Sequence, residues 1–132
     1  MEQRMTLEQV VAAIRAALDA GMHIDDQAVK RLADAHGVGE ATVWLIVNDA
    51  GASEVRRFAS AWAHADDETR RRWSALLQLA WELGQRGQIN TDRDALASVE
   101  AALGVPGGLL LAGVDGVEPY DVDRVVADCM EG

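Results

Sequence analysis

Apolar residues recur every three or four positions along most of this 132-residue chain, and capping residues and glycines separate the recurrences. Such spacing puts the apolar side chains on one face of an α-helix, which has about 3.6 residues per turn. The first such segment, 7–18, follows Thr6, which can form a capping box with Gln9. Gly21 is expected to end this helix. The pattern predicts an all-α fold of about six or seven helices in a single domain spanning residues 1–132.

The longest expected helix covers about 67–86, after a cap at Asp66. Its apolar residues form more than one stripe, so we expect it to be central in the core or shared between the subunits of a homodimer. Shorter helices are expected at 26–36, 40–50, from 53 onward, at 92–103 and at the C-terminus. The helix at 92–103 is expected to present the apolar residues Leu96, Val99 and Leu103, and the C-terminal helix an amphipathic stripe of Val122, Val125, Val126, Cys129 and Met130.

Two segments have strand as an alternative. Val43–Val47 is β-branched and aromatic, but we favour helix there because of the motif described below. The segment 109–118 contains Asp115-Gly116, which suits a two-residue turn, so a small β-hairpin is about as well supported as helix.

Acidic residues outnumber basic ones by 22 to 12, which gives a formal charge of −10 and a pI near 4.6. This charge argues against a nonspecific polyanion binder, because phosphates would be repelled on average. Eleven of the basic residues are arginine and one, Lys30, is lysine, a composition typical of GC-rich prokaryotes and phages. The acidity also fits adaptation to a high-salt cytoplasm. In that case the charge gives no information about a binding partner.

The apolar fraction of 49% is too high for a disordered chain. The longest unbroken aliphatic or aromatic run, 43–47, is too short to span a bilayer, so we expect no membrane association. The N-terminus lacks the basic start and apolar stretch of a secretory signal. A single cysteine, Cys129, excludes an internal disulfide, and a cytoplasmic location is expected.

Residues 29–48 read VKRLADAHGVGEATVWLIVN, two helical segments separated by a turn that begins at Gly37. Glycine adopts the left-handed backbone of such a turn without strain. The inward positions are Leu32, Ala33, Val38, Val43 and Ile46. These 20 residues resemble the helix-turn-helix of bacterial and phage DNA-binding regulators, and we place that motif at about 26–50.

The resemblance implies that the second helix enters the major groove of DNA. The positions expected to face outward are Gly39, Glu40, Ala41, Trp44, Leu45 and Asn48. Of the residues on this helix, Asn48 suits a base edge and Thr42 suits a phosphate. Residues 24–51 nevertheless carry a net charge of −3, the wrong sign for a surface that binds phosphates.

Basic residues gather just beyond the motif. Arg56 and Arg57 open one helix, and Arg70, Arg71 and Arg72 lie at the start of the longest one. In a DNA-binding protein these arginines would contact the phosphate backbone. The alternative is a solvated arginine run neutralised by the neighbouring aspartates and glutamate at 66–68.

Trp44 and Leu45 are apolar at positions expected to face outward. An exposed Trp-Leu pair would be an anchor for a protein partner. The alternative is that the fourth or fifth helix covers Trp44 and extends the core.

No pattern argues for catalysis, a cofactor or a metal. The glycines at 37 and 39 lack the preceding strand and third glycine of a phosphate-binding loop. The three histidines are scattered, and His64 beside Asp66 and Asp67 is better explained by helix capping. Cys129 lies on an apolar stripe, as a buried structural thiol would. We therefore do not expect an enzyme.

Two hypotheses follow. The first is a small helix-turn-helix regulator that binds DNA as a homodimer joined through helix 67–86. The second is an acidic adaptor, inhibitor or DNA mimic that keeps the helix-turn-helix shape but binds a protein, such as a nucleic-acid enzyme, through Trp44 and Leu45. The first is ranked slightly higher on the motif alone.

Overall fold

The fold was analysed in a computed structural model, which describes residues 5–131. These residues form one all-helical domain and contain no strand, which confirms the expected fold class. The helices are α1 Leu7–Asp19, α2 Asp26–His36, α3 Glu40–Val47, α4 Ala52–His64, α5 Asp67–Gln85, α6 Arg93–Leu103, α7 Leu109–Val114 and α8 Pro119–Glu131.

Side-chain caps explain where several of these helices begin. The Thr6 hydroxyl and the Gln9 amide form the expected reciprocal capping box at the start of α1. Asp25 and Asp66 accept hydrogen bonds from backbone N–H groups in the first turns of α2 and α5, at 2.8 and 2.7 Å. At the end of α2, Gly37 adopts φ +67°, as the left-handed turn requires.

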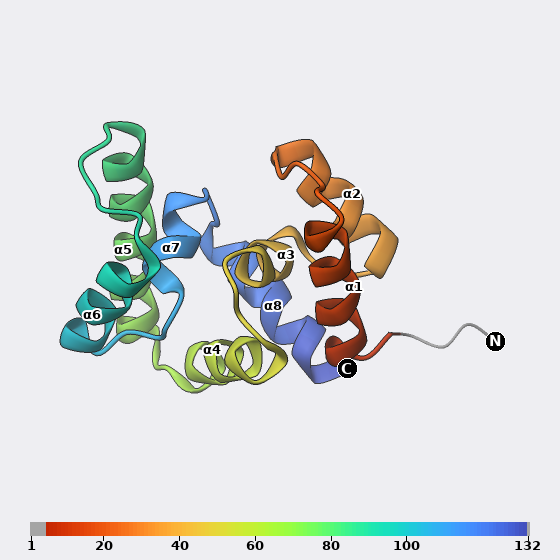
Figure 1. Cartoon of the computed structure of the whole chain (residues 1–132). Helices are drawn as coiled ribbons and strands as arrows, with labels where there is room; N and C mark the ends of the chain where they lie inside the picture. The colour runs from red at the N-terminus through yellow and green to blue at the C-terminus, as the bar shows by residue number, and fades with distance from the viewer. Residues whose placement is uncertain (1–4, 132) are drawn as a thin grey trace.

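Helix α3 is the centre of the domain (Figure 1). It packs against α1, α2, α4, α7 and α8. Five of its eight residues are buried: Ala41, Thr42, Val43, Leu45 and Ile46. The expectation that Ala41 and Leu45 face outward is therefore wrong, because a helix that is apolar all round is covered on every side.

A carboxylate from α8 caps the N-terminus of α3. The N-cap residue of α3 is Gly39, which has no side chain to bond the first free N–H groups. Asp128 takes this role, because its Oδ2 accepts hydrogen bonds from the Gly39 N–H at 2.8 Å and the Thr42 hydroxyl at 2.6 Å. Arg124 completes the joint, with Nε 2.9 Å from Asp128 Oδ1 and a second nitrogen 3.2 Å from the Gly37 carbonyl. The turn between α2 and α3 is thus fastened to α8.

The same arrangement recurs at α7. Its N-cap is Gly108, at φ +98°, and again offers no side chain. The buried Glu100 carboxylate of α6 accepts the N–H of Gly108 at 3.0 Å and of Leu110 at 2.8 Å. A carboxylate near a helix N-terminus is also favoured by the helix dipole. Both short, glycine-capped helices are therefore held by an acidic side chain from a neighbouring helix.

Helix α7 packs closely on α5. A methyl group placed on Gly113 would lie 2.7 Å from the Leu77 carbonyl oxygen and 2.9 Å from Ala80 Cβ. Gly84 faces Val114 on the same interface. Glycine at these contacts lets the two backbones approach, which explains why a six-residue helix is stable here.

Three expectations need correction. The hairpin at 109–118 is absent, because 109–114 is the helix α7 and Asp115-Gly116 ends that helix. This additional helix raises the number in residues 5–131 to eight. Val99, Leu103 and Met130, which were assigned to inward stripes, are exposed, whereas Glu100 and Asp128 are buried beside them because they cap other helices.

Replacing Asp128 with alanine should destabilise the domain by about 1–3 kcal/mol, because two buried donors lose their acceptor. Urea unfolding followed by circular dichroism measures this, with the exposed Asp34→Ala as control. Equal stability of the two variants would show that Asp128 does not hold α3.

Gly113→Ala should also cost about 1–3 kcal/mol, because the methyl group meets a backbone oxygen that cannot rotate away. The matched control is Gly107→Ala, where a methyl group meets nothing within 4 Å. The same unfolding experiment applies, and a Gly113→Ala variant as stable as Gly107→Ala would contradict the close α5–α7 packing.

Candidate functional site

The two residues expected to read DNA are already engaged inside the protein. Thr42 is 0% exposed and its hydroxyl donates to Asp128, so it is not on the surface that a phosphate would reach. The half-buried Asn48 donates from its side-chain amide to Asp115 Oδ2 at 2.5 Å. Its partner lies directly after α7. Thr42 and Asn48 therefore do not form the DNA-contacting surface that was expected on α3.

Arg56 and Arg70, two of the five predicted arginine contacts, bond to residues of other helices. Arg56 forms a two-pronged ion pair with Glu8 of α1, at 2.6 and 2.7 Å. The hydrogen bonds from Arg56 lower the pKa of Glu8 to about 2. Arg70 donates to the carbonyls of Trp62 and Ala63 at the end of α4, at 3.1 and 3.2 Å. Both arginines join helices.

The other three arginines lie on the surface in two places. Arg71 and Arg72 are exposed near the start of α5, three and four residues after the acidic run 66–68, and Arg72 donates to the Thr69 hydroxyl at 3.4 Å. Arg57 is exposed on α4 and lines a groove. The structure does not gather the five arginines into one basic face.

The proposed Trp44–Leu45 anchor is not a surface pair. Leu45 is only 4% exposed and its side chain packs toward Gly108 at the start of α7. Trp44 is half-buried and packs against the main core. Leu45 is thus covered by the start of α7, and Trp44 is partly covered by the core.

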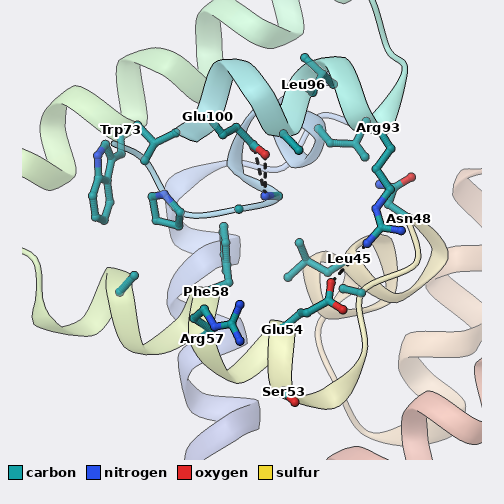
Figure 2. A pocket seen from close by; sticks show the side chains of 18 of the residues that line it. Leu45, Asn48, Ser53, Glu54, Arg57, Phe58, Trp73, Arg93, Leu96 and Glu100 are labelled. Atoms are coloured by element: carbon teal, nitrogen blue, oxygen red, sulfur yellow. Dashed lines mark hydrogen bonds and ion pairs between the residues drawn. The ribbon is translucent and has the colours of Figure 1, made fainter. Parts of the chain in front are cut away.

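A groove of about 710 Å³ opens between α4 on one side and α6 with the 104–108 loop on the other (Figure 2). This volume is in the range of binding sites for small molecules and peptide segments. Apolar side chains lie along it from Leu45 and Phe58 to Trp73. The Trp73 ring is supported by Trp62 of α4, with the ring centroids 6.2 Å apart.

Charged groups frame the groove, and most are paired. Arg93 of α6 reaches Glu54 of α4 at 3.4 Å and Asp49 at 3.5 Å. Glu100 is occupied by the backbone N–H groups of α7. Among residues 5–130, whose side chains the structure describes, Arg57 has neither an ion pair nor a hydrogen bond, and Figure 2 draws it without one. The groove lining, which carries two arginines and two glutamates, therefore presents one unpaired guanidinium beside its apolar side chains.

Most groove residues were missed by the sequence analysis. A signal was present at Glu100, an acidic residue four positions after Leu96 and therefore on the inward side of α6. The glycines at 107 and 108 mark a helix start without a side-chain cap. Together they indicate a carboxylate that caps from a neighbouring helix, but sequence spacing does not show the groove that this contact borders.

Other chemical features are few. Cys129 is half-buried against the core, and burial raises the pKa of its thiol. No three His, Cys, Asp or Glu side chains in residues 5–131 are grouped to hold a metal ion. Every helix in this same range is too short or too polar to cross a membrane.

Comparison with models of protein families, with curated proteins and with solved structures gave no match. The functional reading therefore rests on the residues and geometry of this chain.

The burial of Asp115 should make the stability of the folded domain depend on pH. Its burial raises its pKa to about 6, against the lowering effect of the Asn48 hydrogen bond and with a further rise from the charge of Asp26. The ordinary value in an unfolded chain is about 3.9. Because the folded state holds this proton more tightly, the contribution of Asp115 to stability is greatest below about pH 4 and falls as the pH rises through about 6.

Asp115→Asn should remove this dependence while keeping an acceptor for Asn48. The unfolding free energy of the variant, compared with that of wild type, should rise between pH 4 and pH 7 in urea titrations. Asp19→Asn, on the exposed end of α1, is the control and should follow the wild-type profile. Parallel profiles for all three proteins would contradict the raised pKa.

Proposed function

We propose that this protein is an acidic protein-binding module whose partner docks in the groove between α4 and α6. The observation that carries the proposal is the groove itself, a concavity of about 710 Å³ lined by apolar and polar side chains in a protein of charge −10. Concave apolar sites with a few polar groups are the usual binding sites of proteins. The remaining surface is acidic and suits a partner with basic residues around an apolar segment.

In this proposal the helix-turn-helix is a packing motif. The α2–turn–α3 arrangement at 26–47 supports that shape, because Gly37 has the required left-handed backbone. A recognition helix needs a free face to enter the major groove. Contacts with α1, α4, α7 and α8 surround α3 and leave Glu40 as its one exposed side chain. Protein binding is therefore favoured over DNA reading, the reverse of the order that the motif suggests.

Self-association through α5, which the DNA-binding hypothesis included, is not part of this proposal. Leu79 and Trp81 are 48% and 41% exposed on α5. They lie two positions apart and thus on different sides of the helix. This separation favours a monomer with scattered apolar side chains over a continuous dimer stripe, and sedimentation velocity distinguishes the two states.

Filling the groove should abolish partner binding. Ala61 of α4 and Ala97 of α6 line opposite walls, so Ala61→Trp and Ala97→Trp place a large ring inside the groove. Ala63→Trp and Ala101→Trp add the same ring to exposed positions of the same helices, outside the groove lining. The groove variants should lose at least tenfold in affinity, and the matched controls should bind as wild type does.

The partner is first captured from a lysate of the source cells with and without nuclease, then identified, purified and titrated by calorimetry against all five proteins. A nuclease-resistant partner whose affinity falls only in the two groove variants supports the proposal. Equal affinity for all five proteins would overturn it. Salt-sensitive binding to genomic duplexes, with no protein captured, would favour the DNA-binding regulator instead.

A further inference from the structure

The charges in the groove differ in how they are used. The Glu100 carboxylate already accepts hydrogen bonds from backbone N–H groups at the start of α7, and Glu54 is paired with Arg93 across the groove. Arg57 stands one helical turn from Ala61 on α4 and has no partner among the described residues. The lining as a whole, with Glu54 and Glu100 against Arg57 and Arg93, carries no net formal charge, and Arg57 is its one charged group left free to pair with a ligand.

Apolar contacts lie next to this charge. Phe58, the neighbour of Arg57 in sequence, is in the groove lining, and Trp73 and Pro106 line it further along (Figure 2). A ligand in this groove would pack an apolar group against these rings while an anionic group reaches the guanidinium. Arginine is suited to this task because its planar guanidinium donates two parallel hydrogen bonds, one to each oxygen of a carboxylate.

We propose that the docking segment presents a carboxylate next to large apolar side chains and that Arg57 pairs with this carboxylate. This inference rests on the proposed function and adds the chemistry of the partner segment. The occupant is a segment of a protein, because the lining runs along α4 from Ser53 to Ala61 and along α6 from Arg93 to Glu100, a length that suits an extended chain. The unpaired positive charge of Arg57 favours an acidic group on this segment.

The inference is tested with two tripeptides that differ only in charge. N-acetyl-Leu-Phe-Leu with a free C-terminal carboxylate is compared with the same peptide as a C-terminal amide. Binding is followed by NMR through the indole N–H signals of the tryptophans. The Trp73 signal should shift, and the signal of Trp81, which lies against Gly116 outside the groove, should not.

The carboxylate peptide should bind wild type about tenfold more tightly than the amide, the difference expected for a charge-assisted pair of about 1.4 kcal/mol. Arg57→Gln should remove this difference and leave amide binding unchanged. Arg71→Gln, an exposed arginine on α5 outside the groove lining, is the matched control and should keep the preference.

Three results would overturn the inference: no shift of Trp73 with either peptide, equal affinity for both peptides, or a preference that survives Arg57→Gln. Octanoate serves as a third probe. If octanoate binds with dependence on Arg57 while neither peptide binds, the groove is a site for small amphipathic acids and the protein-segment assignment is wrong.

Failure here is distinguishable from failure of the proposed function. If Ala61→Trp and Ala97→Trp lose the partner while the peptides show no carboxylate preference, the groove remains the docking site and only the role of Arg57 is refuted. If the groove variants keep the partner, the docking site itself is refuted whatever the peptides show.

Discussion

The fold depends on two carboxylates, each of which caps the N-terminus of a helix other than its own. Asp128 binds the N-terminus of α3, and Glu100 binds that of α7. Each replaces the side-chain cap that a glycine cannot supply. The free N–H groups of a buried helix end are costly to leave unpaired. Two short helices can therefore lie in the interior only because α6 and α8 bring acidic groups to them.

These caps also change the meaning of the negative charge. A formal charge of −10 suggests a surface property, yet two acidic side chains of the described residues, Glu100 and Asp128, are buried and support the geometry of the core. Glu8 and Glu54 are paired with arginines that join separate helices. The net charge thus describes the average surface poorly. It neither excludes a local positive site nor identifies one, and the unpaired Arg57 becomes visible only after the pairs are assigned.

Local sequence signals predicted the helices well and their surroundings poorly. Thr6, Asp25 and Asp66 act within one turn of the backbone, so their caps could be read directly. The inward stripe of α6 was misassigned, because Val99 and Leu103 share the spacing of core residues. Contacts such as Asp128 to Gly39 join residues 89 positions apart, and no periodicity encodes such a pairing.

The function expected of α3 could not be predicted from local sequence signals either. A helix-turn-helix pattern specifies two helices and a turn but not what covers the second helix. Here α8 is fastened over its N-terminus by Asp128, and α7 covers Leu45. The cap that fixes α7 also holds the 107–108 loop, which forms one wall of the groove. The contact that fastens α8 over the expected binding helix is therefore of the same kind as the contact that holds one wall of the groove: in both, a carboxylate from a neighbouring helix binds a glycine N-cap.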